Sequence, residues 1–431
     1  MNYTEVLILV LSFMVFMSLR VPIAYAVGLA GLLTLASAMP FLPSVTTMAQ
    51  RMATSLDSFT LSAIPFFILA GQVMNRGGIA VRLINLAKAI VGPLPGGLAF
   101  VNIISCMLFG AISGSAAAAA SAIGGFMTPM MEKEGYDKPF SAAVNITSAT
   151  TGLIIPPSNI LIIYSLASGG VSIAALFIAG YIPGIVLGTG LMIVAAIYSF
   201  IKKYPTDKMV GAKEFFKRFL AALPSLLLLV VVIGGIVAGI FTATEASAIA
   251  VIYTFVLAAI YKEITWKDVT PIFLETIKTS AIVLLLIATS IAMSWVMSYE
   301  NIPQEISNGL LSISNDPIVI LIIINLILLF VGMFMDMTPA VLIFTPIFLP
   351  IVTNLGMDPI HFGIVMVLNL CIGLCTPPVG SVLFVGCSVA GLSIQKVIRP
   401  LLPLFVAMIV ILFIITYVPE LSLWLPRQLG F

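Results

Sequence analysis

Long apolar runs follow one another along almost the whole chain, separated by short segments that hold nearly all of the charged residues. A helix that crosses the hydrocarbon core of a bilayer needs about 20 apolar residues. Most of the runs have this length, so they predict a succession of membrane-spanning helices. They lie near residues 4–19, 21–40, 60–75, 93–131, 139–168, 173–201, 220–241, 243–261, 279–298, 317–354, 359–390 and 400–418.

Two runs, 93–131 and 317–354, are too long for a single span, and each contains a polar or Gly/Pro-rich break near its middle. The breaks are Gly110–Ser115 and Gly332–Pro339. Two half-length helices around a polar tip form a re-entrant hairpin. Irregular backbone at that depth must be buried in protein or line a cavity.

Two further runs, 139–168 and 359–390, contain a Pro-Pro pair, in the segments Gly152–Asn159 and Gly373–Gly380. Proline removes a backbone donor and clashes with the preceding turn, so each pair is expected to open its helix. The carbonyl groups freed at the opening then need a partner.

The two halves of the chain repeat these features at a spacing of 221 residues. At that offset Pro129 matches Pro350, Gly152 matches Gly373, and Pro156-Pro157 matches Pro377-Pro378. We therefore predict an all-α polytopic membrane protein made of two repeats, 1–205 and 220–431, joined by a basic linker, 206–219.

The basic residues predict the orientation. If the hairpins return to their own side, each half crosses the membrane five times, and an odd number makes the second half inverted. Cytoplasmic segments carry an excess of Lys and Arg. With both termini in the periplasm, 17 of the 19 Lys and Arg residues fall on the cytoplasmic side, in 20, 76–92, 132–138, 202–219, 262–278 and 395–399.

Two segments beside the hairpins, 78–91 and 302–313, combine charges with an apolar background. This combination predicts amphipathic helices that lie at the membrane interface. The first carries Arg82 and Lys88, whereas the second carries Glu305.

Composition excludes most other classes. Hydrophobic residues make up 61% of the chain and charged residues 8%, against about 25% charged residues in a soluble domain. The first run, with no basic residue before it and Arg20 behind it, predicts a span of the mature protein rather than a secretory signal. The sequence has no phosphate-binding G-x-x-x-x-G-K-[ST] motif, so we do not expect an ATP-driven pump. It also has no evident cluster of catalytic or metal-binding residues, so we expect no enzyme, and we expect no nucleic-acid partner.

Two opposed hairpins and two opposed broken helices predict a solute site near the membrane midplane. The amino end of a broken helix favours anions, and freed carbonyl groups favour cations. A Ser-capped helix follows the uncharged first tip, so a substrate carboxylate is expected there. The candidate substrate-binding residues are Ser113, Gly114, Ser115, Thr151 and Asn159.

The second tip carries Asp336, an expected helix cap that would repel an anion and tolerate a sodium ion. Oxygen-only ligand sets suit a hard monovalent cation. A proton carrier would use a relay of buried carboxylates, which Asp336 and Glu245 do not form. The candidate sodium ligands are Gly110, Ala111, Gly152, Ile155, Ser158, Gly332, Asp336, Thr338, Gly373, Thr376 and Val379. The one histidine, His361, is expected at the surface or interface, and Glu245 is expected to pair locally or to face a partner helix.

These motifs, in this order, resemble the large membrane subunit of TRAP transporters, the DctM type. The resemblance covers the whole chain and rests on five segments. They are Arg20–Ala24, Ile64–Phe67, the Ser113–Ala120 tip, the Ile154–Ser158 break and the Thr376–Pro378 break.

The resemblance implies a sodium-coupled importer of organic acids in the bacterial inner membrane. It also implies a small membrane subunit, expected here as a separate chain, and a periplasmic solute-binding protein. An elevator mechanism is implied, with 93–170 and 317–391 sliding against the other spans. Family substrates include C4-dicarboxylates and sialic acids, and overall similarity favours sialic acid. The alternatives are a stand-alone sodium/dicarboxylate carrier of the same architecture, an ion channel and a membrane scaffold that transports nothing.

Overall fold

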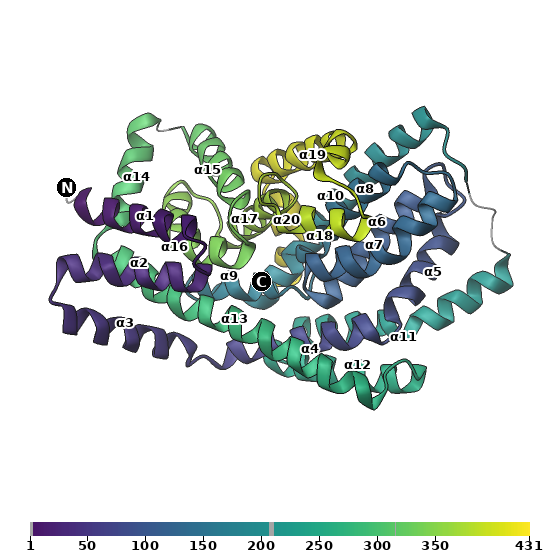
Figure 1. Ribbon diagram of the computed structural model, residues 1–431, viewed down its shortest axis with the longest axis horizontal. Coiled ribbons are helices and arrows are strands. Elements are labelled where there is room, and N and C mark those ends of the chain that lie inside the picture. Colours follow the sequence, from purple (N-terminus) through teal and green to yellow (C-terminus); the bar gives the residue numbers. More distant parts are fainter. Residues whose placement is uncertain (1–2, 207–210, 315) are drawn as a thin grey trace.

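The computed structural model describes residues 3–206, 211–314 and 316–431, which are almost entirely helical (Figure 1). The elements of the first half are α1 Tyr3–Ser18, α2 Ile23–Ala38, α3 Phe41–Leu56, η1 Phe59–Ser62, α4 Ala63–Arg76, α5 Ile79–Val91, α6 Gly97–Ser113, α7 Ala116–Lys133, α8 Lys138–Ala149, η2 Thr151–Leu153, α9 Asn159–Ala167 and α10 Ile173–Lys202.

The second half follows the same order, with one long helix, α13, in place of α3 and α4. The inversion of the two halves and their boundaries stay predictions. The elements are α11 Ala212–Val237, α12 Ala243–Tyr261, α13 Trp266–Tyr299, α14 Ile302–Ile313, α15 Pro317–Gly332, α16 Met337–Asn354, α17 Pro359–Leu374, α18 Ser381–Ala390, α19 Ile394–Tyr417 and α20 Glu420–Gln428.

Several helices have the length and apolar character of membrane spans. Among the described residues six pass this test, and α3 with α4 adds a seventh as a pair bent by 66°. The shorter apolar helices α6, α15, α17 and α18 are pieces of divided runs, whereas α1 and α2 are undivided but short. The six that pass the test are α10, α11, α12, α13, α16 and α19.

All four predicted breaks are confirmed as interruptions between helices. Gly114 ends α6 with a left-handed backbone, φ 61°, which glycine adopts without steric cost. Pro156-Pro157 and Pro377-Pro378 lie between the two pieces of their helices, and both bonds are cis.

Two helices are buried on nearly every side and form the centre of the molecule. Every residue from Phe140 to Ala149 of α8 is buried, as is every residue from His361 to Leu374 of α17. The expected surface or interfacial place of His361 was therefore wrong: it lies in α17, 1% exposed, with its Nε2 3.2 Å from the Thr416 carbonyl oxygen.

The hairpins and broken helices form one body, which packs on a layer of α1–α4 and α11–α13. In Figure 1 α3, α4 and α11–α13 run below the body, and α1 lies at the level of α16. The arms α5 and α14 lie at opposite ends of the molecule, where the sequence predicted amphipathic helices. Each contacts both parts, α5 packing on α11 and α6, and α14 on α13 and α16. The arms thus connect the layer to the body that holds the breaks.

The sequence placed α10 and α19 among the spans against which the hairpins would slide, but both helices pack on the body. α10 packs on α6, α17 and α19, and α19 packs on α8 and α17. The body therefore includes α10 and α19 as well as 93–170 and 317–391. Apolar runs identify spans but not the neighbours of each span, so the sequence could not make this assignment.

Three helices extend beyond the predicted spans. Because α13 begins at Trp266 behind a capping box of Thr265 and Asp268, most of the predicted cytoplasmic segment 262–278 is helical. The linker 206–219 is shortened in the same way, since α11 begins at Ala212, and its residues 207–210 lie outside the described part of the chain. α19 likewise includes the predicted loop 395–399, and α3 and α20 were not predicted at all.

Candidate functional site

A cavity of about 320 Å³ lies where both hairpins and both broken helices meet. The amino-terminal residues of α7, α9, α16 and α18 all line it, together with side chains of α4 and α13. Each helix amino terminus carries unpaired amides and a partial positive charge. Four such termini lie on the wall of one cavity, and no Lys or Arg is among its described lining residues.

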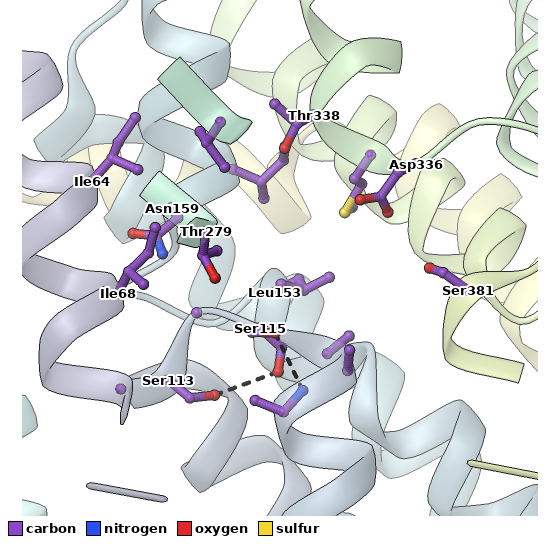
Figure 2. A pocket seen from close by; sticks show the side chains of 18 of the residues that line it. Ile64, Ile68, Ser113, Ser115, Leu153, Asn159, Thr279, Asp336, Thr338 and Ser381 are labelled. Atoms are coloured by element: carbon purple, nitrogen blue, oxygen red, sulfur yellow. Dashed lines mark hydrogen bonds between the residues drawn. The ribbon is translucent and has the colours of Figure 1, made fainter. Parts of the chain in front are cut away.

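The first hairpin tip forms part of the wall of this cavity. Ser115 is the N-cap of α7, and its Oγ accepts a hydrogen bond from the Ala118 amide at 3.2 Å. The Gly114 amide donates to the Gly110 carbonyl oxygen at 2.8 Å and closes α6. Ser113, Gly114, Ser115 and the first residues of α7 line the cavity, as the sequence predicted for a carboxylate site (Figure 2).

Asn159, the first residue of α9, packs against this tip. A Cβ atom on Gly114 would lie 2.7 Å from the Asn159 Nδ2, so only glycine permits this contact. The Asn159 Oδ1 is buried without a hydrogen-bond partner, and a buried polar atom of that kind is costly unless a ligand or water meets it. Asn159 lines the cavity, whereas Thr151 lies buried in η2 and does not.

The second tip places Asp336 and Thr338 on the same cavity. Asp336 is the N-cap residue of α16, as expected, but its side chain makes no capping hydrogen bond. The carboxylate instead points toward the hydroxyl of Ser381, across the opening of the second broken helix (Figure 2). Asp336 is the one charged residue among the described lining residues, so the cavity has a cation-attracting end opposite the first tip.

The sequence missed the side of the cavity that α4 and α13 supply. Gln72 and Asn75 of α4, three residues apart and so on one helix face, line it with Thr279 of α13. A Cβ atom on Gly71 would lie 2.8 Å from the Ser113 carbonyl oxygen, which brings α4 directly against the tip. Two amides inside an apolar helix were the only signal that could have identified this side.

The remaining candidate sodium ligands lie behind the tips, outside the cavity lining. Each hairpin meets the adjacent broken helix through two glycines: a Cβ atom on Gly110 would lie 2.8 Å from the Gly152 Cα, and one on Gly332 would lie 3.1 Å from the Gly373 Cα. The structure thus brings together both predicted glycine pairs. Of the other five, Ala111 is buried in α6, and Ile155 and Ser158 are buried in the first break. In the second break Thr376 is half-buried and Val379 is exposed.

Hydrogen bonds fix the two breaks against their surroundings. The Ser158 hydroxyl donates to the Leu153 carbonyl oxygen, and the Thr376 hydroxyl donates to the Ile372 carbonyl oxygen at 2.7 Å. The Val379 amide donates to the Met333 carbonyl oxygen at 3.3 Å, which ties the second break to its hairpin. Each hydroxyl keeps lone pairs with which it can accept or coordinate.

Replacing Ser115 with alanine should weaken substrate binding more than it weakens the fold. The variant loses one cap bond, worth about 1 kcal/mol, and reorients the amides that face the cavity. We expect the substrate concentration for half-maximal uptake in proteoliposomes to rise several-fold. Ser172 is the matched control, because its side chain makes the same cap bond to Ala175 at 3.3 Å on α10. An equal rise of this half-maximal concentration in Ser172→Ala would contradict a substrate site at the tip.

A helical membrane body with two hairpins, two broken helices and a polar central cavity defines a membrane solute transporter. Its family follows from the sequence: residues 10–421 match the model of the tripartite ATP-independent periplasmic transporter, DctM component, and the chain belongs to this family. Its members are permeases rather than enzymes.

Several known proteins are similar to this chain along nearly their full lengths. The chain is 56% identical to the uncharacterized protein YgiK of Salmonella typhimurium, covering 98% of this chain and 97% of the relative. It is 40% identical to the C4-dicarboxylate TRAP transporter large permease protein DctM of Pseudomonas aeruginosa, covering 94% of each. It is 38% identical to the sialic acid TRAP transporter large permease protein SiaM of Vibrio cholerae, covering 88% and 89%.

The fold recurs in a solved structure of low sequence identity. The YdaH transporter of Alcanivorax borkumensis aligns with a TM-score of 0.64 at 14% identity, over 90% of this chain and 89% of that one. At this identity the likeness concerns the fold alone.

Proposed function

We propose that this TRAP large permease imports an organic acid together with sodium, receiving the acid from a periplasmic binding protein and working beside a small membrane subunit. The observation that carries the proposal is the central cavity, with four helix amino termini and one carboxylate on its walls. The amino termini provide a site for the acid, and Asp336 provides a cation-attracting group beside it.

The substrate class is an organic anion small enough for a cavity of about 320 Å³. The names of relatives support two candidates, a C4-dicarboxylate and sialic acid. The identities to these two relatives, 40% and 38%, are nearly equal, so identity does not choose between the two acids. Uptake of each radiolabelled acid, competed with the other, separates the two.

An elevator movement is part of the proposal. The body of hairpins and broken helices would slide along the layer of α1–α4 and α11–α13, with both termini in the periplasm and the arms α5 and α14 at the interfaces. The position of the arms, each contacting both parts, supports this division. The cavity lies at the boundary itself, since α4 and α13 form one wall and the tips form the other.

Reconstitution tests the tripartite proposal. The chain alone, the chain with its small subunit, and both with the binding protein are placed in proteoliposomes, and uptake is measured under an inward sodium gradient. We expect uptake only in the complete system. Uptake by the lone chain would favour a stand-alone sodium/dicarboxylate carrier of this architecture. Uptake at the same rate with and without a sodium gradient would contradict sodium coupling.

Replacing Thr376 with alanine should raise the sodium concentration for half-maximal uptake by about fivefold, because one hydroxyl ligand contributes roughly 1 kcal/mol. The acid concentration for half-maximal uptake at saturating sodium should change little. Thr353 is the control, since its hydroxyl makes the same bond to the Leu349 carbonyl oxygen, at 2.8 Å, near the end of α16. Unchanged sodium dependence in Thr376→Ala would contradict the proposed site.

A further inference from the structure

A second cavity, of about 250 Å³, lies between α6, the first Pro-Pro break, α10 and α11. It touches none of the residues of the central cavity, and its walls are apolar. Tyr181 and Thr189 are the polar residues among its described lining, and the Thr189 hydroxyl already donates to the Ile185 carbonyl oxygen at 2.8 Å. A trapped water needs two to four polar partners, so this space does not suit water.

The mouth of this cavity opens on the apolar outer surface of α10 and α11, two helices with the length and composition of membrane spans. Ile185 and Thr189 of α10 are exposed on the outer surface while they line the cavity. On α11, the lining residue Leu229 lies between the exposed Leu227 and Val230. A dry space that opens toward lipid is filled most readily by lipid chains, because leaving it empty forfeits dispersion contacts.

The depth of the cavity matches the end of an acyl chain. Lys217 lies twelve residues before Leu229 on α11, which corresponds to about 18 Å along a helix. Half of the hydrocarbon core is about 15 Å thick. A lipid whose headgroup lies at the level of Lys217 would therefore reach the cavity with the end of one chain.

The first turns of α11 provide the matching charge. Lys213 and Lys217 are exposed there, beside the exposed aromatic ring of Phe216. Arg218 is already paired with Glu214, at 3.0 Å, and therefore contributes less to the attraction of an anionic headgroup. Each lysine near the membrane surface strengthens binding of an anionic lipid roughly fivefold.

We propose that the second cavity binds one acyl chain of an anionic phospholipid of the cytoplasmic leaflet, whose headgroup lies against Lys213 and Lys217. The chain then fills the gap between the body, through α6 and α10, and α11 of the layer. The site is separate from the substrate cavity, so it does not depend on the identity of the transported acid.

Native mass spectrometry of the purified protein tests the proposal. Phosphatidylglycerol and phosphatidylcholine with identical palmitoyl and oleoyl chains are added in turn, and the retained lipid is counted. Wild-type protein should retain at least one phosphatidylglycerol, about 25-fold more strongly than phosphatidylcholine, because the two lysines contribute about fivefold each. Lys213→Gln with Lys217→Gln should abolish this preference, whereas Lys267→Gln with Lys278→Gln on α13 should keep it.

A second variant fills the cavity itself. Thr189→Trp should reduce retention of both lipids, while Ile193→Trp, one turn further along α10 and outside the cavity lining, should leave retention unchanged. Equal retention in Thr189→Trp and wild type would overturn the cavity as the site, as would equal loss in both tryptophan variants. If Thr189→Trp does not fold, the lysine variants decide alone: an unaltered lipid preference there overturns the proposal.

Discussion

Gly152→Ala should unfold at a markedly lower temperature than the wild-type protein and should lose nearly all uptake. The added Cβ atom would lie 2.5 Å from the Gly110 carbonyl carbon and 2.8 Å from the Ala111 amide nitrogen. These atoms belong to the backbone of α6, so no side chain can rotate away. Overpacking of a well-packed interior costs about 1–3 kcal/mol, and a backbone clash of this kind falls at or above the upper end.

The second half offers an independent copy of this test. A Cβ atom on Gly373 would lie 2.6 Å from the Gly332 carbonyl carbon, so Gly373→Ala should behave in the same way. Gly125→Ala is the control, because nothing lies within 4 Å of its Cβ position on α7. Thermal-shift midpoints and uptake in proteoliposomes are measured for all three. Midpoints for Gly152→Ala and Gly373→Ala that match the control would show that the hairpins do not pack on the broken helices through these glycines.

Asp336→Asn should reduce sodium-driven uptake by about 10- to 100-fold, because an interaction with a charged group is worth about 1.5–3 kcal/mol. The carboxylate is the charged group on the described cavity wall, and its side-chain partner there is the Ser381 hydroxyl rather than a cation. A charge kept inside a membrane protein without a charged partner is expected to act on a transported ion or solute.

Asp316→Asn provides the comparison for Asp336→Asn. Asp316 is also the N-cap of a hairpin helix, but its carboxylate accepts a hydrogen bond from the Ile318 amide at 2.9 Å. Because Asn and Asp are about equally good N-caps, this control should keep both its stability and its uptake. Sodium titrations of uptake and thermal-shift curves are compared for both variants. Wild-type uptake by Asp336→Asn would exclude the carboxylate from the transport cycle.

The sequence alone determined the class, the helices and the places where they break. Apolar runs of fixed length follow from the thickness of the bilayer, so α1, α2, α10 and α12 could be located to within a few residues. Pro-Pro pairs and the Ser113–Ser115 tip interrupt helices for local reasons of backbone chemistry, and the structure has its breaks there. The family could likewise be identified from those motifs.

Only the tertiary structure decided which helices are neighbours. Lipid-facing and protein-facing sides of a span are both apolar, so composition cannot assign α10 and α19 to the body or bury His361 in α17. For the same reason the sequence could not identify Gln72 and Asn75 as lining residues of the cavity. They line it only because α4 lies against the first tip. The sequence thus determines where apolar spans lie and where they break, whereas the cavity exists only where separate helices converge.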